Sequence, residues 1–151
     1  LRRLLQKLGF KKLSRGVYIT PLPISAQLKD FLLEKKFSAK ITVIESRRLL
    51  LGDDKQLAKQ VWFLDNLLKE YQNLIIWVKR LLRQIKHKKG LTVKEKEQFS
   101  LILSFYFSLL ENDPGLPKKL LPTDWLADLA KERFLELAYQ MKTKENQGGR
   151  V

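Results

Sequence analysis

A long stretch without Pro or Gly, from Lys55 to Lys89, constrains the fold of this chain more than any other feature. Apolar residues recur in it at steps of three and four, which is the period of an amphipathic α-helix. These residues are Leu57, Val61, Leu64, Leu68, Tyr71, Ile75, Val78, Leu82 and Ile85. The pattern predicts one long helix that ends at Gly90. Because helices of globular proteins are usually shorter, we expect a kink or break near Gln72 and Asn73.

Cap residues predict where this helix and the two that follow it begin. Asp53 or Asp54 can cap the long helix. Thr92, with Glu95 three residues later, forms a capping box for the next one. The inward stripe of that helix is predicted to be Phe99, Ile102, Leu103, Tyr106 and Leu110. Thr123 or Asp124 is predicted to cap the last helix.

The first fifty residues show helical and strand patterns in alternation. Residues 1–8 carry leucines on one helical face, and residues 26–35 form a second amphipathic helix, for which Ser25 is the predicted cap. Strands are predicted over residues 13–20 and 39–45. Both faces of the second strand are apolar, so we expect it to be buried on both sides.

This order of elements predicts the class α+β, with a partial ferredoxin-like domain followed by a helical domain. The first domain covers residues 1–52 and lacks its first strand, which we expect upstream of Leu1. The helical domain covers residues 53–145, and residues 146–151 form a tail. An exposed sheet edge and the long apolar helix also predict a homodimer.

The positive charge lies mainly in the first ninety residues. The chain has 30 Lys and Arg against 16 Asp and Glu, a formal net charge of +14. Residues 1–50 hold 12 basic and 3 acidic residues, 51–90 hold 9 and 4, and 91–151 hold 9 and 9. Such a surface predicts a polyanionic partner, with nucleic acid first and an anionic membrane or phosphorylated ligand next.

A set of basic residues near the predicted strands and the end of the long helix is the candidate phosphate-binding surface. It consists of Lys11, Lys12, Arg15, Arg47, Arg48, Lys79, Arg80, Arg83 and Lys86. The alternative is that these residues only keep the protein soluble. Tyr18 and Trp77 could stack on bases, although each lies on a stripe more typical of a core. The sequence contains no recognition-helix signature.

Several kinds of chemistry are excluded or disfavoured by what the chain lacks. It has no Cys and a single His, His87, so thiolate and multi-histidine metal sites are excluded. Paired Asp53 and Asp54 precede a helix, where capping explains them better than acid–base catalysis does. No glycine-rich phosphate loop is present. We therefore expect no metal, no cofactor and no enzymatic activity. No apolar run could span a membrane, so we expect a cytoplasmic protein.

Three motifs of the chain, at residues 8–21, 57–71 and 113–125, resemble those of one known family. The segment 8–21 contains Leu-Gly-Phe and then Leu-Ser-Arg-Gly-Val-Tyr-Ile-Thr-Pro, which resembles the family's L-x-x-x-G-F-x-x-L-x-x-G-V-W-I-x-P pattern. The segment 57–71 resembles its L-A-x-x-x-W-D-L-x-x-L-x-x-Y pattern. The segment 113–125 is similar to its D-P-x-L-P-x-x-L-L-P-x-D-W motif. The motif positions are Gly9, Phe10, Gly16, Tyr18, Trp62, Asp113, Pro114, Leu116, Pro117, Pro122 and Trp125. With these motifs the chain resembles the PaaX-type transcriptional repressors.

The resemblance spans about residues 1–140. It implies that proteins of the family have a three-part architecture. The parts are an N-terminal winged helix, a central ferredoxin-like domain similar to small CRISPR-associated endoribonucleases, and a helical C-terminal domain. The winged helix and the first central strand are absent from the sequence. In the nuclease relatives that strand ends in the Asp that binds the metal, so the resemblance does not extend to nuclease activity.

The function implied by the resemblance is that of a DNA-binding transcriptional repressor fragment. It would supply dimerisation and the sensing of an acyl-coenzyme A-like effector. It would contact DNA through an N-terminal domain or through its basic face. The alternatives are a basic nucleic-acid-binding module without catalysis and a relative of the ferredoxin-like, metal-dependent nucleases. The motif at residues 113–125 has two possible interpretations. It is either a rigid segment that packs Leu116, Leu120 and Trp125 over a helical core, or part of a ligand site.

Overall fold

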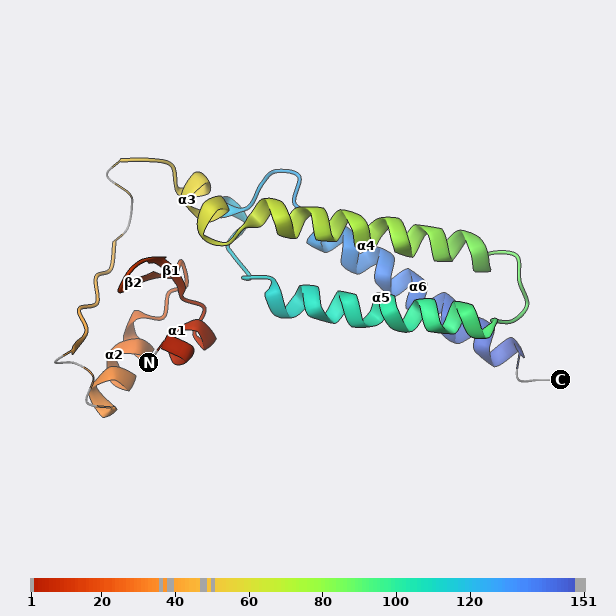
Figure 1. Ribbon diagram of the computed structural model, residues 1–151, viewed down its shortest axis with the longest axis horizontal. Helices are drawn as coiled ribbons and strands as arrows, with labels where there is room; N and C mark the ends of the chain where they lie inside the picture. Colours follow the sequence, from red (N-terminus) through yellow and green to blue (C-terminus); the bar gives the residue numbers. More distant parts are fainter. Residues whose placement is uncertain (1, 36, 38–39, 47–48, 50, 149–151) are drawn as a thin grey trace. The chain divides into compact units, whose positions relative to one another are not determined.

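The computed structural model describes residues 2–35, 37, 40–46, 49 and 51–148, which fall into two compact units (Figure 1). Residues 1–62 and 114–121 belong to an N-terminal unit. Residues 63–113 and 122–151 belong to a helical unit. None of the helices among the described residues has the length and apolarity needed to cross a membrane.

The N-terminal unit combines short helices with a small sheet. Its elements are α1 (Arg2–Lys7), β1 (Lys11–Ser14), β2 (Val17–Ile19), α2 (Ser25–Glu34), α3 (Asp54–Val61) and the 3-10 helix η2 (Lys118–Leu120). The sheet that the structure describes has two antiparallel strands, with Lys11 opposite Ile19. The prediction of one strand over residues 13–20 is therefore wrong. Gly16, at φ +79°, turns the chain there and makes a hairpin, because its backbone adopts a left-handed conformation that other residues rarely take.

The second predicted strand, residues 39–45, is also wrong over its described part. Residues 41–46 have no strand structure, and Val43 and Ile44 are 50% and 84% exposed rather than buried. Ala39 lies outside the described residues. An alternating pattern shows that a segment could pair, but pairing also needs a neighbouring strand, and the described sheet contains only the hairpin.

The predicted fold class is confirmed at the level of architecture. The protein is mostly helical, with a small two-stranded sheet near its N-terminus, and a helical region follows. Within the described ranges, the part of a ferredoxin-like arrangement that is seen is this hairpin with its neighbouring helices.

The helical unit consists of α4 (Leu64–Ile85), α5 (Val93–Asn112) and α6 (Ala127–Gly148), which run alongside one another (Figure 1). Their apolar stripes meet in one core. It contains Leu67, Tyr71, Leu74, Ile75, Val78, Leu81, Ile85, Ile102, Tyr106, Leu109, Ala130, Phe134, Leu137 and Met141. The inward stripe of α5 includes Leu109, whereas the predicted Leu110 is 46% exposed. Residues 146–148, predicted as tail, continue α6, and residues 149–151 lie outside the described residues.

The long predicted helix is interrupted at Phe63, not near Gln72 and Asn73. Phe63 has φ 52° and ψ 44°, a left-handed conformation that is rare for a bulky residue, and it separates α3 from α4. Trp62 is buried in the N-terminal unit, and Leu64 is fully buried in the helical unit. In a continuous helix two such residues would lie about 200° apart around the axis. The interruption lets both be buried.

The structure confirms two of the helix caps predicted from the sequence and differs from the prediction at two others. The Asp53 carboxylate accepts a hydrogen bond from the Lys55 amide at 2.7 Å, which confirms it as the cap of α3. The capping box of Thr92 and Glu95 is also confirmed. Ser25 is the first residue of α2 and does not cap it, since Ile24 occupies the cap position. The last helix starts at Ala127, three residues after Asp124.

Candidate functional site

A groove between α4 and α5 is the main candidate site of the helical unit. Its apolar section has a volume of about 490 Å³, and its polar section adjoins it with about 320 Å³. Arg80, Gln84 and Gln98 line both sections, so the two form one continuous groove, which we call the α4–α5 groove. Volumes of this size are typical of small-molecule sites.

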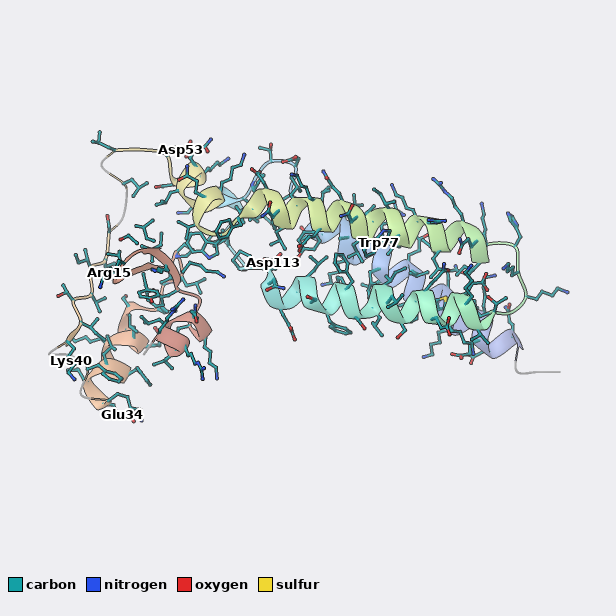
Figure 2. The ribbon with its side chains drawn as sticks, viewed as in Figure 1. Arg15, Glu34, Lys40, Asp53, Trp77 and Asp113 are labelled. Atoms are coloured by element: carbon teal, nitrogen blue, oxygen red, sulfur yellow. The ribbon has the colours of Figure 1, made fainter. Side chains whose placement is uncertain are left out.

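Aromatic and leucine side chains form the apolar section. Trp77 of α4 and Phe105 of α5 pack with their ring centroids 4.8 Å apart, and Figure 2 shows Trp77 on the side of α4 that faces α5. Trp77 is still 44% exposed and Leu101 is 71% exposed. The expectation that Trp77 faces a core is therefore wrong. The section presents an apolar surface to a ligand from solvent.

The polar section lies toward the turn between α4 and α5. Arg80, Lys88 and Lys94 supply three positive charges there, and Glu95 supplies one negative charge. Arg80 and Lys94 form no ion pair with any residue in the described part of the chain. The groove therefore has an apolar end and a cationic end. Along α4, its lining extends from Trp77 to Gln84, about 10 Å at the α-helical rise.

A buried polar cluster holds the turn at the cationic end. The Lys88 ammonium donates to Glu95 Oε1 at 2.5 Å, and the Thr92 amide donates to Glu95 Oε2 at 2.8 Å. These two donors lower the pKa of Glu95 from 4.5 to about 2, although its burial opposes the shift. From α6, the buried Lys144 donates to the carbonyl oxygens of Lys88 at 2.6 Å and Lys86 at 3.4 Å.

The predicted phosphate-binding residues fall in both units. Lys11 and Lys12 lie on β1, and all of Lys11, Lys12 and Arg15 are exposed. Arg15 lies in the hairpin turn (Figure 2). Arg47 and Arg48 lie outside the described residues. The residues of the helical unit come together on one helix. Lys79, Arg80 and Arg83 are exposed on α4, and Lys86 follows its last residue. Each unit therefore carries its own group of exposed basic residues.

The motif residues of the hairpin have structural roles. Gly9 has φ +83°, and a Cβ there would lie 2.8 Å from Leu22 Cδ1, so both backbone conformation and space require glycine. Phe10 directly follows Gly9, just before β1, and is partly buried. Tyr18, on β2, is also partly buried.

The motif around residues 113–125 supplies packing contacts to each unit. In the helical unit, the Tyr71 hydroxyl donates to Asp113 Oδ2 at 2.6 Å, and the Tyr71 and Trp125 rings pack edge to face at 5.6 Å. Burial and the Asp113 carboxylate raise the pKa of Tyr71. In the N-terminal unit, Leu116 is buried. Pro114 follows Asp113, and Pro122 precedes the turn that leads to α6.

A second, smaller hollow lies within the N-terminal unit. Its volume is about 230 Å³, and Trp62, Pro117 and Leu120 are among its lining residues. The segment 114–121 thus packs beside α3. The hypothesis that the motif at residues 113–125 is part of a ligand site stays a prediction.

The sequence did not point to most of the groove. Only Arg80 and Trp77 were among the candidates, whereas Gln84, Gln98 and Phe105 were not. The signal available was an extra apolar pair, Leu101 and Phe105, four residues apart and beside the inward stripe of α5. Within the described ranges, no group of three or more acidic or histidine side chains could hold a metal ion.

Comparisons with known families place a domain boundary close to residue 62, where the first stretch of the N-terminal unit ends. A family model described as PaaX-like protein C-terminal domain matches residues 62–147, more than half of the chain. A second, described as PaaX protein central Cas2-like domain, matches residues 1–58. The matched ranges change next to the interruption at Phe63. A comparison with curated proteins gave no match.

Proposed function

The chain belongs to the PaaX-like family of transcriptional regulators, and from that premise we propose that its helical unit binds an effector in the α4–α5 groove. The regulators of this family are generally not enzymes. The observation that carries the proposal is the polarity of the groove, apolar at Trp77 and Phe105 and cationic at Arg80 and Lys94. A ligand that fits it has an apolar group at one end and an anionic group at the other.

An acyl-coenzyme A-like effector meets this description. Its acyl chain would remove the apolar section from water, a gain of about 25 cal/mol for each Å² buried. Its phosphates would pair with Arg80 and Lys94, whose positive charges have no other ion-pair partner among the described residues. Binding would shift the regulator between states of different DNA affinity.

Isothermal titration of the full chain with hexanoyl-coenzyme A tests the effector site. Leu101→Trp should fill the apolar section and weaken binding at least tenfold. Leu135→Trp is the matched control, because Leu135 is also exposed but lies on α6, away from the groove lining. Coenzyme A alone and hexanoate alone should each bind more weakly than the thioester. Equal effects of the two Trp substitutions would refute the site.

We also propose that the basic side of α4 contacts DNA. Lys79, Arg83 and Lys86 are spaced four and three residues apart, so they lie along one side of the helix, and all are exposed. Duplex binding should fall steeply with salt. Neutralising the three with Gln should reduce the slope of log K against log salt by about 2.7. Lys131→Gln with Lys142→Gln on α6 is the control, and an equal loss in the control would contradict the proposal.

A homodimer is the assembly that we propose for the regulator. Ile44 and Leu51 of the N-terminal unit are 84% and 88% exposed, and exposed apolar side chains commonly mark interfaces. Sedimentation velocity should show a dimer at micromolar concentration. A monomer across the whole concentration range would contradict this part of the proposal.

A further inference from the structure

One of the three cations at the cationic end of the α4–α5 groove is already paired with a carboxylate. Arg80 and Lys94 have no ion pair among the described residues, but Lys88 is bound to Glu95. The two partners differ in accessibility, since the Lys88 side chain is 47% exposed and the Glu95 side chain only 5%. An incoming anion can therefore reach the ammonium from solvent while the carboxylate stays buried.

Glu95 also has a second hydrogen bond that keeps it in place without Lys88. The Thr92 amide donates to its other oxygen at 2.8 Å, as part of the capping box of α5. Losing Lys88 would thus leave Glu95 hydrogen-bonded at the start of the helix. The positive end of the helix dipole also favours the ionised carboxylate there.

The backbone at residue 88 is held independently of its side chain. Lys144, buried on α6, donates to the Lys88 carbonyl at 2.6 Å. Because this contact involves the backbone, the Lys88 side chain can change partner by rotating about its own bonds. Such rotations are fast in exposed side chains.

We propose that Lys88 is an anion switch, which pairs with Glu95 in the empty groove and with an anionic group of the ligand in the occupied groove. This inference rests on the proposed effector site and names the residue that responds to the ligand's charge. The ligand class is a phosphate- or carboxylate-bearing amphiphile. On binding, three cations surround the anion, and Glu95 loses the closest of its partners, so occupancy reaches the turn between α4 and α5.

Competition for Lys88 has an unusual consequence for mutants. Removing the carboxylate with Glu95→Gln should strengthen anion binding, because Lys88 is then free and a nearby negative charge is gone. We expect about a tenfold gain, the order of one charge-assisted hydrogen bond. Lys88→Met should weaken binding by a similar factor. A purely structural role for Glu95 would give no gain in affinity.

The test uses the full chain and titrates inorganic pyrophosphate by calorimetry at constant ionic strength. Glu95→Gln should bind about tenfold more tightly than the wild type, and the gain should vanish in the Glu95→Gln, Lys88→Met double variant. Glu97→Gln is the matched control, because Glu97 is an exposed glutamate of α5 outside the groove lining. A gain equal to that of the control, or one that persists without Lys88, would overturn the switch.

A second measurement covers the case in which Glu95→Gln does not fold. In the wild type, pyrophosphate should shift the NMR signals of the Glu95 carboxyl carbon and the Lys88 ε-carbon together. Unchanged signals at saturation, or no pyrophosphate binding, would overturn the inference. The effector site is judged separately by hexanoyl-coenzyme A and Leu101→Trp, so either proposal can fail without the other.

Discussion

The hydrogen bond between Tyr71 and Asp113 offers a quantitative test of how the helical unit is held together. Tyr71→Phe removes only the hydroxyl, which donates to Asp113 Oδ2 at 2.6 Å. The ring stays buried and keeps its edge-to-face contact with Trp125. The loss is therefore that of a single hydrogen bond to an ionised group, which contributes about 1.5–3 kcal/mol.

The lower half of that range applies, because the pair is only partly buried and water reaches Asp113. We expect the free energy of unfolding to fall by about 1.5–2 kcal/mol. For a chain of this size, that lowers Tm by roughly 3–8 °C. Urea and thermal unfolding followed by circular dichroism at 222 nm measure both quantities.

A double-mutant cycle then separates the hydrogen bond from the other contacts of Asp113. Tyr71→Phe and Asp113→Ala should be non-additive by about 1 kcal/mol or more, since each removes the same interaction. Additivity within about 0.5 kcal/mol would mean that the hydroxyl and the carboxylate do not interact, and the reasoning would be refuted.

Three further predictions concern the interruption and the polar cluster. Phe63→Gly should be more stable than Phe63→Ala by about 1 kcal/mol in urea unfolding, because Gly adopts the left-handed conformation without steric cost; the reverse order would contradict it. Measuring the free energy of unfolding at falling pH should detect the contribution of Glu95, whose folded pKa of about 2 lies below its usual 4.5. Its contribution to stability is complete above about pH 5 and is lost as the pH falls toward 2. Glu95→Gln should flatten that part of the pH profile, and an unchanged profile would argue against it. Lys144→Met should destabilise by about 1.5–3 kcal/mol in thermal unfolding, because it removes a charged donor from two carbonyl oxygens. Lys142→Met, on the exposed face of α6, is the control and should change little.

Much of the helical unit could be predicted from local pattern. The stripe through Tyr71, Val78 and Ile85 is buried as the three- and four-residue spacing indicates. Asp53 and the Thr92–Glu95 pair cap the helices that they precede, since a side-chain oxygen near free helical amides has a local reason to bind them. The motifs also identified the family correctly.

The candidate site was harder to predict, because its residues lie at the edges of the apolar stripes of α4 and α5. Position 77 flanks the buried positions 74, 78 and 81 of α4, where an apolar residue suits either a core or an open groove. Which of these it becomes depends on how closely α5 covers that side of α4. The pairing of Lys88 with Glu95 similarly requires the turn that brings the end of α4 to the start of α5.

The sequence alone determined the helical periodicity, the caps with side-chain acceptors and the excess of positive charge, because these depend on residues a few positions apart. Only the tertiary structure decided where the long helix breaks, whether residues 13–20 form one strand or a hairpin, and which side chains line the groove. Trp62 and Leu64 show the physical reason. Each residue fits a helix locally, but both are buried, on sides that one continuous helix would turn about 200° apart. A choice between helix continuity and burial is made by packing, not by local propensity.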